Sequence, residues 1–544
     1  MNNNESRLVT LAFLLGAFLI FGGLGSLPLM VPDEGRNAEV AREMKESGSW
    51  LVPTYNGLPY LDKPAFYFKT VALSMSLFGE NETGARFSSA VAGFLLLVIT
   101  FLFARREYGT RTGAFAVMVV ATSPLFLAFS RLVIFDMMLA LFVCGAIFAG
   151  YRGFWRTSAV CAALATLVKG PVGFLIPVLV LAVYDFRLLK RIFAPVNLLI
   201  FFGLTLPWFF GVNHYHNDFA YYGLVEESFH RYTTTAFRRT GPWWYYGPWL
   251  LVGMLTWCPL LPESIVAAWR NRRHWSNADR LLIVWCIVVI LFFSISKSKR
   301  PDYILSAIVA LGILVARVMN RAAEAQTRRW SLALGGFCLI ATGVVVWLAL
   351  HPGKIGALRR VPGADVTHEL LAVAAALAIG LVVAAIAWRR KHSGWTMAAY
   401  VGVPALVGTL GFAALRWYAE SKSARALADA MPPLPADTII AGMECFPTGF
   451  PFYRHQFVNV ITDDGGEFTS NYIIFMLKKT KPWPAGVTHI DERDAWLAAQ
   501  KQPVFLLSRR RNGSDIAGIA QARGATVTNL VTGWWGTLLL PEGR

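Results

Sequence analysis

The chain has 544 residues, of which 55% are hydrophobic and 15% are charged. Soluble domains carry about 25% charged residues, so this composition excludes an ordinary soluble protein and favours a polytopic helical membrane protein. The net charge is +18, but the basic residues gather in short loops between apolar stretches and no nucleic-acid-binding module is recognisable, which argues against nucleic acid as a partner. The six cysteines form no CxxC pair, so neither a disulfide framework nor a cysteine metal site is expected.

Apolar stretches long enough to cross a bilayer recur as far as residue 416 and predict about thirteen spans. Their approximate limits are 8–30, 86–104, 112–129, 132–150, 153–168, 170–184, 192–212, 243–267, 279–296, 302–319, 330–350, 368–388 and 395–416. The first span is expected to be retained, because it is too long for a signal-peptide core and no small-residue cleavage pattern follows it. Every second loop is strongly basic, which predicts a cytoplasmic N-terminus and an outer location for the residues after 416.

The outer segment that follows the first span reads VPDEGRNAEV from residue 31. It delivers Asp33 and Glu34 to the membrane surface, and its pattern predicts an amphipathic helix over Glu34 to Ser47, ended by Gly48. Asp33 could act only as the N-cap of this helix, or it could also meet a substrate at the membrane rim. The sequence leaves both interpretations open.

A second outer segment, YLDKPAFYFK, covers residues 60–69. Pro64 can open a helix that Gly79 would end, and its charge and length suit the membrane interface rather than a span. The expected apolar face comprises Phe66, Tyr67, Val71, Leu73 and Leu77. Lys63 could simply extend its ammonium toward water from the interface, or it could bind an anion.

Several further cations stand out because outer loops are otherwise poor in basic residues. They are Arg131, Lys169, Arg231, Lys299 and Arg300. The simplest partner for them is an anion at the outer leaflet, such as a lipid phosphate, although ordinary charge scatter is the alternative. Asp136 lies within an apolar span, where a carboxylate is costly, and it is therefore either functional or paired with Arg131.

Residues 417–544 change character, because their apolar runs shrink to strand length and alternate with turn-rich polar segments. Strands are predicted at 438–440, 457–461, 472–477, 504–507 and 533–540, and a helix at 493–500. The sequence thus predicts a membrane domain over 1–416, with outer interfacial helices near 33–80 and 214–240, followed by a periplasmic α/β domain over 417–544.

Six motifs in chain order carry a resemblance to a known family. They are DEGRNAEVAREM (33–44), SGSWLVPTYNGLPYLDKP (47–64), SRLVIFDMM (130–138), VKGPVG (168–173), PWF (207–209) and SISKSKRPDYIL (294–305). Together they resemble the bacterial protein mannosyltransferase-like GT-C glycosyltransferases, among them the lipid A 4-amino-4-deoxy-L-arabinose transferases. The resemblance covers roughly residues 8–310 and weakens beyond them.

The resemblance implies an undecaprenyl (polyprenyl) phosphate sugar donor, a cavity at the outer face and an inverting displacement. The family's first acidic loop residue falls on Asp33, its lysine before proline on Lys63 and its acidic residue before methionine on Asp136. Predicted catalytic residues are Asp33, Glu34 and Asp136, and predicted contacts to the donor phosphate are Lys63, Arg131, Lys169, Arg231, Lys299 and Arg300. Asp62 and His230 are candidate ligands of a divalent metal ion. Both depart from the family pattern, because Asp62 stands where relatives have Glu and His230 stands directly beside Arg231.

The chemistry fits these residue types. Preorganised cations can stabilise a leaving phosphate, and a carboxylate can accept the proton of an incoming hydroxyl. The leading hypothesis is an inner-membrane enzyme, expected to be a monomer, that moves a sugar from a polyprenyl phosphate to lipid A. The alternatives are transfer to another envelope glycan or a protein hydroxyl, and, in another class, a flippase for lipid-linked sugars.

Overall fold

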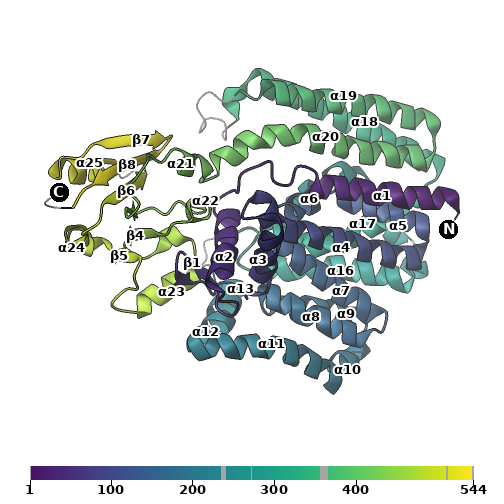
Figure 1. Ribbon diagram of the computed structural model, residues 1–544. Coiled ribbons are helices and arrows are strands. Elements are labelled where there is room, and N and C mark those ends of the chain that lie inside the picture. Colours follow the sequence, from purple (N-terminus) through teal and green to yellow (C-terminus); the bar gives the residue numbers. More distant parts are fainter. Residues whose placement is uncertain (1, 235–239, 271, 356–364, 510–512, 542–544) are drawn as a thin grey trace. The chain divides into compact units, whose positions relative to one another are not determined.

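The computed structural model describes all residues except 1, 235–239, 271, 356–364, 510–512 and 542–544. It divides into two compact units, which are described separately (Figure 1). The helical unit contains Met1–Leu24, Arg86–Ile355 and Asp365–Leu415. The mixed unit contains Gly25–Ala85 and the chain from Arg416 onward.

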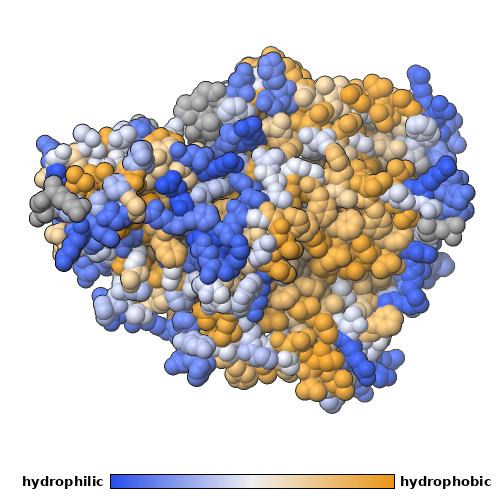
Figure 2. Space-filling view, in the orientation of Figure 1, coloured by the Kyte–Doolittle hydropathy of each residue, from blue (hydrophilic) through white to orange (hydrophobic). Residues whose placement is uncertain are grey.

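Eight helices of the described chain are long and apolar enough to cross a membrane. They are α1 (Asn3–Phe21), α4 (Glu82–Tyr108), α11 (Pro195–Tyr215), α16 (Asn277–Ile295), α17 (Leu305–Asn320, with the preceding turn from Pro301), α18 (Glu324–Leu350), α19 (Thr367–Arg390) and α20 (Ser393–Ser421). Large apolar side chains are exposed on these helices, such as Leu199 (74%) in α11 and Ile340 (70%) in α18. Figure 2 shows hydrophobic residues gathered over the helical unit. Such an extended apolar surface suits contact with lipid.

Two bent helix pairs would raise the number of spans to ten in the same described residues. The pair α5 (Thr110–Ala121) and α6 (Pro124–Ser130) bends by 71°. The pair α14 (Tyr246–Gly253) and Leu255–Val266, which includes η3 (Leu255–Leu260) and the start of α15 (Leu261–Arg270), bends by 106°. Pro124 lies at the first break, where proline lacks the N–H that would continue a helix. The second break lies at Met254, and Pro259 follows it inside η3.

The remaining predicted spans are short helices: α7 (Asp136–Tyr151), α8 (Trp155–Lys169) and α9 (Val172–Tyr184). With 16, 15 and 13 residues they fall below the length of about 20 residues that an upright span needs. Every range predicted to span therefore contains a helix or a bent pair, whereas a count of thirteen crossings stays a prediction.

The mixed unit is built on a six-stranded sheet in the order β5-β4-β3-β6-β8-β7. The strands are β3 (Ile439–Met443), β4 (Val458–Thr462), β5 (Val487–His489), β6 (Val504–Arg509), β7 (Val527–Val531) and β8 (Trp534–Leu539). The first four in the sheet order are parallel, and β8 pairs antiparallel with β6 and β7. Ala441, Ile461, Leu506 and Leu539 lie in the core beside this sheet. The predicted α/β domain at the C-terminus is confirmed.

The sequence placed four of these strands and the helix α24 (Arg493–Ala499) correctly, but it missed β5 and β7. It was wrong at 472–477, where the structure has the helix α23 (Asn471–Lys479). The Ser470 side chain caps that helix by accepting from the Ile473 N–H. A short apolar run does not by itself distinguish a strand from a buried helix, so the cap was the better signal.

The segment between α1 and α4 belongs to the mixed unit. It forms α2 (Asp33–Ser47), β1 (Thr54–Tyr55), β2 (Leu58–Pro59) and α3 (Phe66–Phe78), and α2 packs on α3 and on α22 (Phe450–Arg454). The predicted end of α2 is confirmed, since Gly48 follows this helix with a φ of 68°. The predicted apolar face of α3 was partly wrong, because Leu73 and Leu77 are 59% and 71% exposed. Its buried face instead repeats through Tyr67, Phe68, Val71, Ala72 and Met75 at helical spacing.

Candidate functional site

The first turn of α2 carries the two carboxylates that the sequence singled out. The N-cap position is Pro32, so the interpretation of Asp33 as the N-cap was wrong; Asp33 is the first helical residue. Its Oδ1 accepts a hydrogen bond from Arg36 at 2.6 Å, and its side chain is 24% exposed. Glu34 is buried and accepts from the Met30 N–H at 3.1 Å. Both negative charges are favoured here, because the amino end of a helix carries partial positive charge.

Arg36 connects this turn to the loop before α23. Its NH1 group donates to the main-chain oxygen of Thr469 at 2.7 Å and to the Thr469 Oγ1 at 3.0 Å. Its guanidinium also lies 5.8 Å from the ring centroid of Tyr60. Because a guanidinium is planar and donates in fixed directions, these contacts orient the Asp33 carboxylate. The sequence analysis missed Arg36, although its place three residues after Asp33 on a predicted helix was a signal.

Asp62 and Lys63 lie just before α3, and both are buried. The Asp62 Oδ1 accepts from the Tyr472 N–H at 2.8 Å and its Oδ2 from the Asn471 N–H at 3.2 Å. The carboxylate thus caps the first turn of α23, where N–H groups lack partners within the helix. The Lys63 Nζ donates to the main-chain oxygen of Asp62 at 2.6 Å. A carboxylate whose two oxygens both accept N–H groups is suited to capping a helix rather than to binding a metal ion.

Charged residues continue along α2 into the interior of the mixed unit. Arg42 donates from Nε and NH2 to the two oxygens of Glu39, each at 2.7 Å. Glu43 accepts from the Asn56 N–H and, at 3.1 Å, from the Gly57 N–H. Burial, reinforced by the nearby Glu39, raises the pKa of Glu43 to about 8. The sequence predicted an amphipathic helix here, but residues 34–44 are all buried.

The helical unit holds a second set of buried charges. Asp136 opens α7, Lys169 closes α8, and Asp302 lies in the turn η5 (Pro301–Ile304) before α17. The Lys169 Nζ bonds the Asp136 Oδ1 and lies 3.5 Å from the Asp302 Oδ2. Arg300 completes the set with a 2.9 Å contact from its Nε to the Asp302 Oδ1.

These four charges alternate in sign, and each carboxylate lies at the amino end of a helix while Lys169 lies at a carboxyl end. Both placements agree with the helix dipole. The alternative that Asp136 pairs with Arg131 was wrong, because its carboxylate pairs with Lys169. Asp302 was missed, although it stands two residues after Arg300 in the quoted motif.

Two of the other predicted phosphate ligands are engaged by main-chain oxygens at helix ends. Arg131 donates to the oxygens of Leu19, Ile20 and Gly23 at 2.6–3.2 Å, at the end of α1. The Lys299 Nζ donates to the oxygens of Phe293, Ser294 and Ser296 at 2.6–3.4 Å, at the end of α16. Cations are well placed at such carboxyl ends. Their contact with a donor phosphate stays a prediction.

The last pair of candidates lies around the segment η2 (Tyr222–His230). Arg231 forms an ion pair with Glu227 one turn earlier. The His230 Nδ1 lies 3.1 Å from the Glu226 Oε2. Asp62 belongs to the mixed unit and His230 to the helical unit, and their joint role as metal ligands stays a prediction.

Helices of membrane-spanning length, a C-terminal α/β domain and buried carboxylates beside cations are the features that the comparisons with known proteins must explain. They match a membrane glycosyltransferase of the GT-C type. The structure of ArnT from Cupriavidus metallidurans bound to undecaprenyl phosphate superposes with a TM-score of 0.83 at 25% identity, over 97% of each chain. The apo form of that protein gives a TM-score of 0.84 at 24% identity, over 98% of each chain.

Sequence comparisons agree. A family profile described as dolichyl-phosphate-mannose-protein mannosyltransferase matches residues 62–210. A relative from Edwardsiella ictaluri, named undecaprenyl phosphate-alpha-4-amino-4-deoxy-L-arabinose arabinosyl transferase, is 28% identical over 530 residues, which cover 93% of this chain and 92% of the relative. A relative of the same name from Aeromonas hydrophila is 31% identical over 349 residues, which cover 60% and 64%. The comparisons confirm the resemblance that the motifs carried, to the protein mannosyltransferase-like GT-C glycosyltransferases.

Proposed function

We propose that the protein transfers a sugar from an undecaprenyl phosphate carrier to lipid A or a related envelope acceptor at the periplasmic face of the inner membrane. The match along nearly the whole chain to ArnT bound to undecaprenyl phosphate is the observation that carries this proposal. The names of the curated relatives support the same donor. The alternation of basic and non-basic loops supports the periplasmic orientation.

The reaction is a direct displacement at the anomeric carbon. An acceptor oxygen forms the new bond as the bond from that carbon to the phosphate oxygen breaks, and undecaprenyl phosphate leaves with the electron pair. Lys63 would stabilise the charge on the departing phosphate, since preorganised cations act strongly where water is excluded. Asp33, oriented by Arg36, would accept the proton of an acceptor hydroxyl. If the acceptor is a phosphate that is already ionised, Asp33 would instead position it.

No cofactor is established for this chemistry. A divalent ion held by Asp62 was considered, but both oxygens of that carboxylate accept main-chain N–H groups of α23. Asp62 therefore fits a metal ion poorly, and no proposed step of the sugar transfer depends on one. Activity measured before and after chelation tests this point directly.

The test is mass spectrometry of lipid A from a deletion strain complemented with wild type, Asp33→Asn or Lys63→Ala. Asp463→Asn is the matched control, because Asp463 is an 82% exposed aspartate of the same unit. We expect a sugar-sized mass with wild type and with the control, and a loss of about a hundredfold or more for Asp33→Asn in a purified assay. A product that persists in both site variants would contradict the site assignment.

Unchanged lipid A in every strain would contradict the acceptor. A protein hydroxyl would then be the next candidate, since the profile that matches residues 62–210 is named for a protein mannosyltransferase. A flippase would move the lipid-linked sugar without forming any product. Glycoproteome and envelope-glycan analysis of the same strains separates these outcomes.

A further inference from the structure

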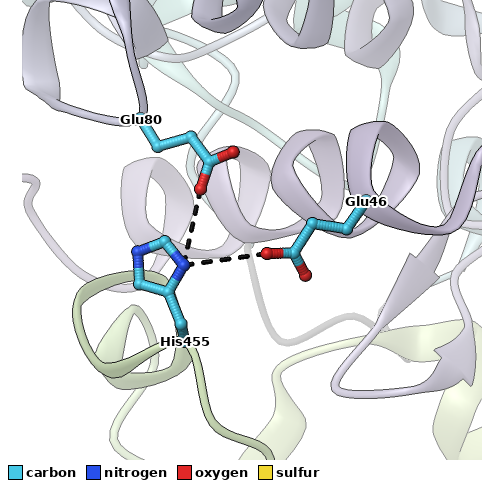
Figure 3. A group of neighbouring side chains, drawn as sticks. All are labelled: Glu46, Glu80 and His455. Carbon is cyan, nitrogen blue, oxygen red and sulfur yellow. Dashed lines mark ion pairs between the residues drawn. The ribbon is translucent and has the colours of Figure 1, made fainter.

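Three ionisable side chains converge at one edge of the mixed unit (Figure 3). Glu46 lies in the last turn of α2, Glu80 lies two residues after α3, and His455 directly follows α22. The His455 Nδ1 lies 3.4 Å from the Glu80 Oε2 and 3.7 Å from the Glu46 Oε1. All three atoms lie within 4.8 Å of one another.

We propose that Glu46, Glu80 and His455 bind a divalent cation of the Zn²⁺ type. The two nitrogen–oxygen distances are longer than good hydrogen bonds. Bonds to zinc of about 2.0–2.2 Å at tetrahedral angles place neighbouring ligand atoms about 3.4 Å apart, which matches the observed spacing. An imidazole nitrogen with two carboxylates suits zinc, whereas calcium and magnesium prefer oxygen ligands alone.

The neighbouring charges permit a cation but limit its affinity. Lys45 contacts the Glu80 Oε1 at 2.6 Å, which is not the oxygen that faces His455. Arg42 contacts the Glu46 Oε1 at 2.6 Å, which is the oxygen that faces His455, and the same guanidinium is also bound to Glu39. Three carboxylates thus face two cations. The helices α2 and α3 also end here, and their carboxyl ends favour positive charge.

Arg42 also faces the imidazole of His455. The Arg42 NH1 lies 3.5 Å from the His455 Nδ1. A metal ion binds the lone pair of a neutral imidazole nitrogen, and a guanidinium can only donate to that lone pair. A bound cation would therefore compete with Arg42 at Nδ1. Affinity should therefore be weaker than at a site without a competing cation.

The site is open to solvent, since the side chains of His455 and Glu46 are 48% and 49% exposed. Water could thus fill the remaining coordination position. The ion would join α2 and α3 to α22 within the mixed unit, which makes the site structural. It is separate from the proposed reaction, because Asp33 and Glu46 lie at opposite ends of α2, about 20 Å apart at the rise of a helix.

The test uses the full-length protein in detergent, stripped with a chelator and then titrated with Zn²⁺. Metal content and the unfolding temperature Tm are measured for wild type, His455→Ala and Glu80→Gln. His489→Ala is the matched control, because His489 also lies between two acidic groups, but Asp491 faces its Nδ1 at 3.3 Å and Asp463 its Nε2 at 3.8 Å. The two acids at His489 thus face different ring nitrogens, whereas Glu46 and Glu80 both face the Nδ1 of His455.

We expect wild type and His489→Ala to bind one more ion than His455→Ala, and their Tm to rise with Zn²⁺. Glu80→Gln should weaken binding at least about tenfold. Equal metal content and equal Tm response in wild type and His455→Ala would mean an adventitious ion only and would overturn the proposal. If His455→Ala does not fold, Glu46→Gln decides in its place, because Glu46 is half-exposed. Transferase activity is assayed in parallel: Asp33→Asn should lose product yet still bind the ion.

Discussion

Two sets of buried charged residues, one in each unit, are balanced in different ways. In the helical unit, Asp136, Lys169, Asp302 and Arg300 neutralise one another through side chains at helix ends. In the mixed unit, Asp62 accepts main-chain N–H groups and Arg36 donates to a main-chain oxygen. A side-chain partner can be removed by one substitution, but a main-chain partner cannot. The two arrangements should therefore respond differently to mutation.

The physical reason is the supply of main-chain partners. Membrane-spanning helices satisfy their own N–H and C=O groups, so a buried charge between them must find another charge or a helix end. The mixed unit has many short helices and loops, and the first turn of α23 offers N–H groups that lack partners within the helix. Two of these groups, the N–H groups of Asn471 and Tyr472, donate to the carboxylate of Asp62.

The largest loss of stability on a single substitution is expected in the helical unit. Lys169→Met should destabilise it by about 3–5 kcal/mol, because Asp136 would remain buried without its cation. Thermal unfolding in detergent measures the loss. The double variant Asp136→Asn with Lys169→Met should recover a large part of it. Equal stability of the single and double variants would contradict the charge-balance argument.

The next effect is a pH dependence of the mixed unit. Glu43 has a pKa of about 8 in the folded protein, against an ordinary value of 4.5. Between these values the folded state keeps a proton that the unfolded state releases. Stability should therefore fall as pH rises, by on the order of 1 kcal/mol per pH unit for this group.

Glu43→Gln removes that titration while keeping one of the two oxygens, which accept separately from the Asn56 and the Gly57 N–H groups. The unfolding free energy of this variant should vary less between about pH 5 and pH 8 than that of wild type. Its stability relative to wild type should be highest at the alkaline end of this range. Denaturant unfolding at several pH values makes the comparison. Parallel curves for the two proteins would show that Glu43 is not the titrating group.

A smaller loss is expected at Asp62. Asp62→Ala should cost about 0.5–2 kcal/mol, the usual range for a helix cap. Hydrogen exchange at the Asn471 and Tyr472 amides should quicken, because the carboxylate is their acceptor. Asp62→Asn is the matched control and should quicken exchange less, since one acceptor oxygen remains. Unchanged exchange in the alanine variant would sink the capping interpretation.

The smallest effect is expected at Thr469. Thr469→Val removes the Oγ1 acceptor of Arg36 but leaves the main-chain oxygen at 2.7 Å. The loss of stability should be about 0.5–1.5 kcal/mol, as for one ordinary hydrogen bond. Chemical unfolding of the purified protein gives the value. A loss as large as that of Lys169→Met would remove the contrast between the two units.

The sequence predicted most of the architecture because hydropathy and terminator residues act locally. Every range predicted to span contains a helix, and Gly48 and Gly79 follow α2 and α3 as expected. The errors also have local causes. The run at 472–477 was too short to distinguish a strand from a helix, and breaks before Pro124 and at Met254 divide two predicted spans into bent pairs.

The site was predictable in its residue types but not in its pairings. Asp33, Asp62, Lys63, Asp136 and Lys169 were all singled out from the sequence, yet their partners Arg36, Tyr472 and Asp302 were not. Asp62 and Tyr472 stand 410 positions apart in the chain. A spacing of that size leaves no periodic signal, so no pattern in the sequence connects them.

The sequence by itself determined that this is a polytopic membrane protein with a C-terminal α/β domain, because burial in lipid and strand-length apolar runs are properties of composition and period. Its motifs also carried the glycosyltransferase class. Only the tertiary structure decided that residues 25–85 form one compact unit with the C-terminal residues, and which group neutralises each buried charge. Charge pairing depends on distances of a few ångströms between remote segments, and the folded chain alone sets those distances.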